Sequence, residues 1–171
     1  MDFMTLIDER RSVRVYERRD VEEEKLAKIL HAANRAPSAG DLQAYEIAVV
    51  RAAAVRQALA RAAVEQQFVG QAPVVLVFLA ELARSSAKYG HRGDSLYALQ
   101  DATIACAYAQ LAAHDLGLAA CWVGAFRSKE VIEAVGAAPG QMPVALLPIG
   151  YPAEKPEPTP RRSLSDLTRR L

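Results

Sequence analysis

Residues 74–80 form an unbroken apolar run, VVLVFLA, between Pro73 and Glu81, and this run constrains the fold more than any other segment. It is far shorter than the ~20 apolar residues that a membrane-spanning helix needs, but its length suits a strand. Strands without polar alternation are buried on both faces of their sheet. We therefore expect residues 74–80 to form a central strand, and we expect no membrane span.

The composition is that of one globular domain. Of the 171 residues, 51% are hydrophobic and 24% are charged, and the formal net charge is +1. Such a chain can bury one sizeable core, but its balanced charge provides no overall field for nucleic acid or an anionic membrane. We expect a single domain over residues 1–171. The N-terminus shows no secretory signal, so the expected compartment is the cytoplasm.

Helical and extended patterns alternate along the rest of the chain. The predicted helices cover residues 2–9, 22–35, 52–68, 95–116 and 129–135, and the other predicted strands cover residues 47–50, 121–123 and 144–149. Asp20 and Glu23 have capping-box spacing at the start of the second helix. The helix at 95–116 is apolar nearly all round, so it should lie inside a core or between subunits. Four prolines from residue 152 onward favour an extended tail.

Several common chemistries have no signature in this sequence. The two cysteines, Cys106 and Cys121, lack metal-ligand spacing and are expected to be reduced core residues. The three histidines are scattered, so no metal site is predicted. A glycine-rich dinucleotide motif, a P-loop and a nucleophile elbow are all missing.

Two segments near the N-terminus could bind a ligand. The sequence RRSVR at 10–14 brings three guanidinium groups and a hydroxyl together, which could hold a phosphate or simply form a solvated basic turn. Pro37 ends the second helix and starts a small polar loop at 37–41, followed by Gln43. This loop could let backbone amides approach a flat heteroaromatic ligand, or it could be an ordinary turn.

Two later segments have similar alternatives. Trp122 and Phe126 enclose Gly124, and this stretch could be a ring-stacking wall or part of the core. Arg161 and Arg162 follow the proline-rich stretch and could clamp an anion or form a basic surface patch. None of the four segments decides a function by itself.

Taken in order, the segments resemble the nitroreductase family of FMN-dependent oxidoreductases. The resemblance rests on RRSVR (10–14), APSAGDLQ (36–43), GLAACWVGAF (117–126), LPIGYP (147–152) and PRR (160–162), and it spans nearly the whole chain. It implies an α+β fold with a mixed central β-sheet flanked by helices. It also implies an intertwined homodimer with two FMN sites at the subunit interface. The C-terminal arm, residues 152–171, would reach across the partner subunit.

The same resemblance assigns FMN-binding residues. Contacts to the phosphate, ribityl chain or pyrimidine are expected from Arg10, Arg11, Ser12 and Arg14, and contacts from the other subunit are expected from Pro37, Ser38, Ala39, Asp41 and Gln43. The isoalloxazine edge would be lined by Trp122, Val123 and Gly124, and the pyrimidine edge would be met by Gln66 or Gln67. The phosphate would be bound by either Arg161 or Arg162.

The activity implied is a ping-pong reaction in which NADH or NADPH gives hydride to flavin N5 and a nitroaromatic or quinone then takes the electrons. Arg14 is the candidate for stabilising negative charge at N1 and C2=O of the reduced flavin. One alternative is a specialised member that dehalogenates an aromatic or fragments flavin with oxygen, with a lid formed by residues 84–94. Another is a non-catalytic flavin-binding dimer, to which Asp41 lends weight because the family commonly has Asn at this position. A nucleic-acid-binding role is disfavoured by the near-neutral charge.

Overall fold

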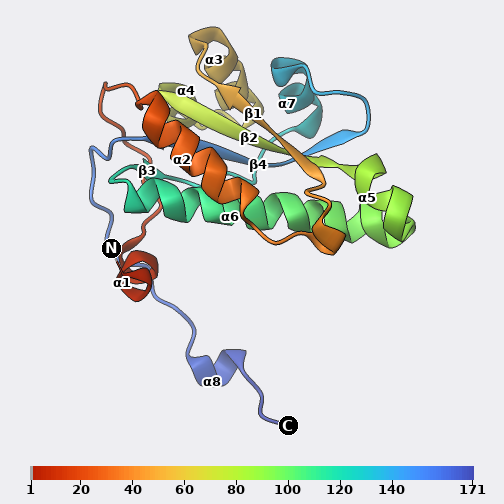
Figure 1. Ribbon diagram of the computed structural model, residues 1–171. Helices are drawn as coiled ribbons and strands as arrows, with labels where there is room; N and C mark the ends of the chain where they lie inside the picture. The colour runs from red at the N-terminus through yellow and green to blue at the C-terminus, as the bar shows by residue number, and fades with distance from the viewer. Residues whose placement is uncertain (1) are drawn as a thin grey trace.

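The computed structural model, which describes residues 2–171, is organised around a four-stranded sheet (Figure 1). The strands are β1 (Tyr45–Val50), β2 (Val74–Glu81), β3 (Ala119–Ala120) and β4 (Gln141–Gly150), in the order β1-β2-β4-β3. All three strand pairs are antiparallel. An isolated parallel bridge joins Ser12 to Ala120, so the sheet is mixed at this edge. The predicted α+β class with helices around a mixed central sheet is confirmed.

Helices cover both faces of the sheet. On one face lie α2 (Glu23–Asn34) and α6 (Ala98–Asp115), and on the other lie α3 (Ala53–Ala62), α4 (Gln67–Gln71) and α7 (Ser128–Val135) (Figure 1). Alternate residues of β2 enter the two layers: Leu76 and Phe78 pack with α2 and α6, whereas Val77 packs with α3 and α7. Residues 74–80 are at most 1% exposed, which confirms the predicted central strand.

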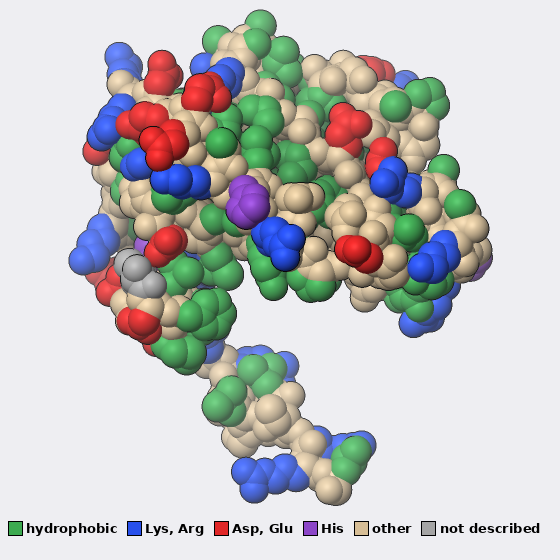
Figure 2. Space-filling model, in the orientation of Figure 1, with side chains coloured by type: hydrophobic (Ala, Val, Ile, Leu, Met, Phe, Trp, Pro, Cys, Tyr) green, Lys and Arg blue, Asp and Glu red, His purple; other side chains and the backbone are tan. Residues whose placement is uncertain are grey.

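The remaining helical elements are short. They are α1 (Phe3–Glu9), η1 (Ala39–Asp41), α5 (Leu82–Tyr89), the π-helical turn η2 (Gly93–Tyr97) and α8 (Leu164–Leu167). The α1 helix and the C-terminal arm project from the body, and hydrophobic side chains lie exposed on both (Figure 2). Phe3 is 63% exposed and Leu164 is 77% exposed. Within residues 2–171, no helix is both long and apolar enough to cross a membrane.

The predicted helix at 52–68 is wrong, because the chain forms two helices there. Val64 and Glu65 adopt left-handed φ values of 57° and 59°, which separate α3 from α4. The turn lets the two helices pack against each other, and Arg56 Nη1 of α3 donates to Gly70 O of α4 at 3.3 Å. A Cβ at Gly70 would lie 2.7 Å from Gln57 Nε2. Tertiary packing here overrides a sequence that is rich in helix-forming residues.

Three smaller predictions also need correction. The strand predicted at 121–123 lies at 119–120, because Gly117, with φ of 74°, ends α6 and turns the chain early into the sheet. The predicted capping box is not formed: α2 starts after Glu22, whose carboxylate instead accepts a hydrogen bond from the Tyr151 hydroxyl at 2.8 Å. The tail is extended as predicted except for the single turn of α8, which Ser163 caps by accepting from the Asp166 N–H.

Candidate functional site

The segment after α1 is extended and lies along the edge of the sheet. Ser12 forms the parallel bridge to Ala120, and the Val13 N–H donates to Ala120 O at 3.3 Å. Side chains of an extended chain alternate between two sides. Arg10, Ser12 and Arg14 therefore point to one side, and Arg11 and Val13 point to the other.

The C-terminal arm holds this segment in place. One carboxylate oxygen of Glu154 accepts the backbone N–H groups of Arg14 at 2.5 Å and of Val15 at 3.1 Å. The Tyr16 hydroxyl donates to Val13 O at 2.8 Å and to Pro148 O at 3.2 Å. Sequence reasoning missed Glu154, since nothing near residue 154 indicates a partner 140 positions earlier in the chain.

Three arginines gather on the first side of the segment. Burial lowers the pKa of the half-buried Arg10, and the positive charges of Arg161 and then of the adjacent Arg11 lower it further, so the Arg161 guanidinium lies near that of Arg10. Arg14 extends the cluster, because its charge and that of Arg10 both act on the Cys121 thiol. In the part of the chain that the structure describes, none of the three guanidiniums is paired with a carboxylate. An anion bound here would relieve the repulsion between them.

One aromatic ring, that of Phe68, borders Arg14, and residues 122–124 follow the strand β3 to which Ser12 is bridged. The Arg14 guanidinium carbon lies 5.8 Å from the centroid of the Phe68 ring. Trp122 is half-buried and Gly124 is exposed, whereas Val123 is buried and forms an isolated bridge to Leu146. The Trp122 side chain packs against the core but keeps part of its surface open, so the two predicted roles of this segment are compatible.

Gln66 ties the start of α4 to the segment 122–126. Its side-chain nitrogen donates to Ala125 O at 3.2 Å and to Ala63 O at 2.8 Å. The alternative candidate, Gln67, is exposed and donates to the Glu65 carboxylate at 3.3 Å. The structure therefore places Gln66, rather than Gln67, beside residues 122–126.

Two of the predicted arginines lie elsewhere. The Arg11 guanidinium, on the opposite side of its segment, donates to Asp8 O at 2.5 Å and to Arg10 O at 3.0 Å. Arg162 donates to Asp166 O at 2.8 Å within the arm. Of the pair Arg161 and Arg162, only Arg161 acts on the charge of Arg10.

The loop that contains Pro37, Ser38, Ala39, Asp41 and Gln43 lies at the other end of α6. Ser38 Oγ closes the loop by accepting from the Gln43 backbone N–H at 3.0 Å and from its side-chain nitrogen at 3.2 Å. The carboxylate of Asp101, in the first turn of α6, accepts the Ala39 N–H at 2.9 Å. The arginine cluster lies near the last turn of α6, roughly 20 Å away at 1.5 Å per residue. Within one chain the two groups cannot bind the same small ligand.

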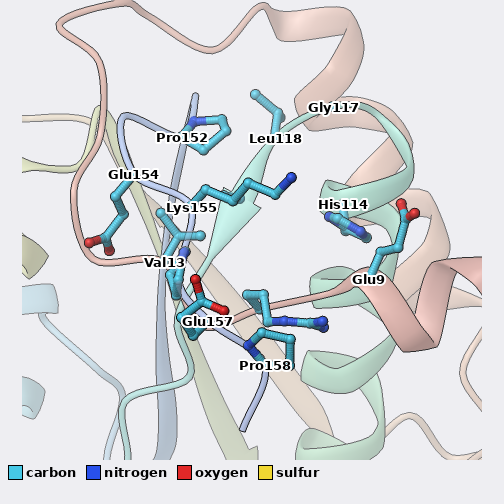
Figure 3. Close-up of a pocket in the computed structure, with 13 residues that line it drawn as sticks. Glu9, Val13, His114, Gly117, Leu118, Pro152, Glu154, Lys155, Glu157 and Pro158 are labelled. Carbon is cyan, nitrogen blue, oxygen red and sulfur yellow. The ribbon is translucent and has the colours of Figure 1, made fainter.

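A cavity of about 780 Å³ lies on the opposite side of the N-terminal segment, where Arg11 and Val13 point (Figure 3). His114, Glu154, Lys155 and Glu157 also line it, so it combines both signs of charge. Burial lowers the pKa of His114, although the negative charge of Glu9 acts to raise it. The mixture of charges selects no single class of ligand, and Arg10, Arg14 and Arg161 are not among the residues that line the cavity.

Comparisons with known proteins identify the fold. The chain matches the family model described as the nitroreductase family over residues 7–70 and 60–151. It is 32% identical to an NADH dehydrogenase of Thermus thermophilus over 191 aligned positions, which cover 96% of this chain and 93% of that protein. It is 30% identical over 168 positions to an FMN reductase (NAD(P)H) of Bacillus subtilis, covering 91% of this chain and 68% of the relative. The structure of the NADPH:FMN oxidoreductase from Vibrio harveyi complexed with NAD+ matches with a TM-score of 0.89 at 25% identity, over 98% of this chain and 76% of that one.

The fold is that of an α+β protein with a mixed central sheet between two layers of helices, and an arginine cluster lies at one edge of that sheet. The family model matches far more than half of the chain, and the Thermus relative matches it almost throughout. The chain therefore belongs to the nitroreductase family. The resemblance found in the sequence motifs is confirmed.

Proposed function

We propose that this chain transfers hydride from NADH or NADPH, through N5 of bound FMN, to a small acceptor such as a nitroaromatic or a quinone, in a ping-pong cycle. The coarser assignment, an FMN-dependent NAD(P)H oxidoreductase, follows from the family. The finer proposal rests above all on the unpaired cluster of Arg10, Arg14 and Arg161, in which Arg14 lies against the Phe68 ring.

The residues at the cluster fit FMN. A phosphate monoester carries up to two negative charges, and guanidinium groups bind it by bidentate, charge-assisted hydrogen bonds. Arg10 and Arg161 supply such groups without a competing carboxylate in residues 2–171, and Ser12 adds a hydroxyl donor. The apolar ring system of the flavin would lie along the segment 122–124. When bound, FMN supplies the hydride chemistry, and the protein supplies orientation and electrostatics.

Each residue of the cluster has a distinct role in this proposal. Arg10, Ser12 and Arg161 bind the phosphate, and Arg14 holds the negative charge that forms at the N1 and C2=O edge of the reduced ring. Gln66 and the backbone of 122–124 orient the ring. Arg11 is left out, because its guanidinium is bonded to backbone carbonyls on the other side of the segment. The Arg14 assignment predicts that Arg14→Ala slows flavin reduction by NAD(P)H in stopped-flow experiments, and an unchanged rate contradicts it.

A homodimer completes the site in this proposal. The Pro37 loop is too far from the arginine cluster of its own chain but would meet that of a second chain. Three exposed apolar surfaces support such an assembly: the outer side of α6 with Tyr108, the α1 helix with Phe3, and the arm with Leu164. A surface of this kind suits an interface between subunits. We propose that the arm, residues 152–171, reaches across the partner and that residues 1–171 form one domain.

One observation favours a second candidate, a flavin-binding dimer without catalytic activity. Asp41 is exposed on the loop that would approach the ring, where its carboxylate accepts from the Gln43 side chain. A negative charge at this place opposes the formation of an electron-rich reduced flavin. The specialised reactions require a lid, and the segment at 84–94 instead contacts the Pro37 loop, through Arg84 Nε to Leu42 O at 2.8 Å.

The test is an absorbance spectrum of the protein loaded with FMN, followed by anaerobic addition of NADH or NADPH. The proposal predicts a bound flavin spectrum that bleaches with one or both donors and recovers when a quinone or nitroaromatic is added. Flavin that binds but stays oxidised favours the non-catalytic dimer. The absence of flavin binding contradicts both candidates.

The expected compartment remains the cytoplasm. Both cysteines, Cys106 and Cys121, are buried and free, and burial raises the pKa of each thiol. Buried thiols of this kind suit a reducing environment.

A further inference from the structure

Asp101 is a buried carboxylate whose hydrogen bonds lead away from its own helix. The residue is 2% exposed, within the first turn of α6. One oxygen accepts the Ala39 N–H at 2.9 Å, and the other accepts the Ala44 N–H at 3.3 Å. The two bonds hold both ends of the segment 39–44, which includes most of the Pro37 loop.

Burial of this carboxylate is costly unless the charge is compensated. No lysine or arginine pairs with Asp101 among the described residues, so the two backbone N–H groups compensate it. Its negative charge acts at close range, because together with burial it raises the pKa of Tyr45. A buried charge that two loop amides compensate fixes the position of that loop.

The loop needs such an anchor because its backbone is strained. Gly40, Asp41 and Gln43 have φ values of 60°, 57° and 42°, and the last two are not glycine. Non-glycine residues in this region cost free energy and persist only where the surroundings hold them. On its outer side the loop is also held by α5, where Arg84 Nε donates to Leu42 O at 2.8 Å and Lys88 Nζ donates to Gly40 O at 3.5 Å.

We propose that Asp101 is a positioning residue for the flavin. It fixes the loop of one subunit so that Ser38, Ala39 and Asp41 meet the flavin bound at the arginine cluster of the other subunit, and it thereby sets the affinity and midpoint potential of that flavin. This inference rests on the proposed function. Asp101 touches no cofactor itself and acts only through the loop.

The test uses Asp101→Asn in the full-length protein. An asparagine has nearly the same volume, but its NH2 group faces one of the two backbone donors, so only one bond can remain. We expect hydrogen exchange to speed up at least about tenfold at whichever of the Ala39 and Ala44 amides loses its acceptor, and the FMN dissociation constant to rise by about tenfold. The flavin midpoint potential should shift as well, which simple loss of stability does not cause.

The matched control is Ala105→Gly, a buried substitution one turn along α6 that leaves the Asp101 carboxylate and its two hydrogen bonds in place. It lowers stability through helix propensity. It should leave loop exchange, FMN affinity and potential at wild-type values. An effect on FMN equal to that of Asp101→Asn contradicts the positioning role.

A second variant leaves α6 unchanged in case Asp101→Asn does not fold. Ala39→Pro removes the backbone N–H that donates to Asp101. Position 39 tolerates proline because it is the first residue of η1, and because the preceding Ser38 is extended, with φ of −138° and ψ of 156°. It should also weaken FMN binding by about tenfold.

The outcomes separate this inference from the proposed function. Wild-type protein that binds no FMN contradicts the proposed function, and the inference fails with it. Wild-type protein that binds FMN, with variants that lose loop protection but keep FMN affinity and potential, contradicts the positioning role alone. Unchanged exchange at both amides in Asp101→Asn contradicts the anchor itself.

Discussion

Arg10→Ala should change the stability of the protein in opposite directions in the absence and in the presence of FMN. In the protein without FMN, Arg10 lies near Arg161 and Arg11, and burial together with these charges lowers its pKa. Removal of the guanidinium relieves repulsion, so the apo protein should lose no stability and should gain some. In the presence of FMN the same substitution removes charge-assisted hydrogen bonds to the phosphate. The sign of the effect on stability should therefore reverse when FMN is added.

The magnitude follows from the strength of such bonds. Hydrogen bonds to charged groups contribute about 1.5–3 kcal/mol, so the FMN dissociation constant should rise by a factor between about 10 and 150. At FMN one hundred times above the wild-type constant, binding stabilises the wild type by about 2.7 kcal/mol. A site about 30 times weaker keeps only about 0.9 kcal/mol at that concentration.

The assay is thermal unfolding of apo and FMN-loaded protein, with fluorescence titration of FMN at two salt concentrations. Arg11→Ala is the matched control, because it removes the same charge from the neighbouring residue on the other side of the segment. It should cost far less FMN affinity, and its small effect should fade at high salt. Equal losses in the two variants, or normal FMN binding by Arg10→Ala, refute the reasoning.

Three further predictions concern the loop, the pH dependence and the packing. Asp41→Asn should raise the flavin midpoint potential, because it removes a negative charge near the proposed position of the ring. A lower or unchanged potential in a spectroelectrochemical titration counts against that position of the ring. The backbone N–H of Glu22 itself and then the Tyr151 hydroxyl lower the pKa of Glu22 to about 2, from an ordinary value of 4.5. The interactions of the Glu22 carboxylate therefore stabilise the fold above pH ~4.5, and this stabilisation is lost as the pH falls towards 2. Tyr151→Phe should make the free energy of unfolding depend less steeply on pH in that range. The same pH dependence in variant and wild type contradicts the assignment. At Gly93, a Cβ would lie 2.6 Å from the Ser85 carbonyl carbon. Gly93→Ala should therefore lower the free energy of unfolding, measured in urea, by about 1–3 kcal/mol. An unfolding midpoint equal to that of the wild type would show that α5 can move aside.

Local patterns in the sequence determine much of this fold. The apolar run at 74–80 and the helical spacing behind α2 and α6 depend on residues close in sequence, and all three elements form as predicted. The break at Val64 and Glu65 depends instead on how α3 and α4 pack on the sheet. Residue preferences favour a continuous helix there, so only tertiary contacts reveal the turn.

The candidate site shows the same division. The order of the arginine-rich and proline-containing segments along the chain indicates which residues contribute to the candidate site, because each motif consists of residues that are close in sequence. The side on which each arginine points depends on the extended backbone at 10–14, which the residue types alone do not reveal, and this explains why Arg11 was grouped with Arg10. Asp101 and Glu154 escaped notice because their partners lie 57 to 140 positions away in the chain.

Native mass spectrometry of the FMN-loaded protein tests most directly the claim that two chains together build each flavin site. The account predicts a dimer that carries two FMN molecules, with flavin lost when the dimer dissociates, because each site needs the arginine cluster of one chain and the Pro37 loop of the other. A monomer that retains FMN, or a dimer that takes up none, contradicts the claim.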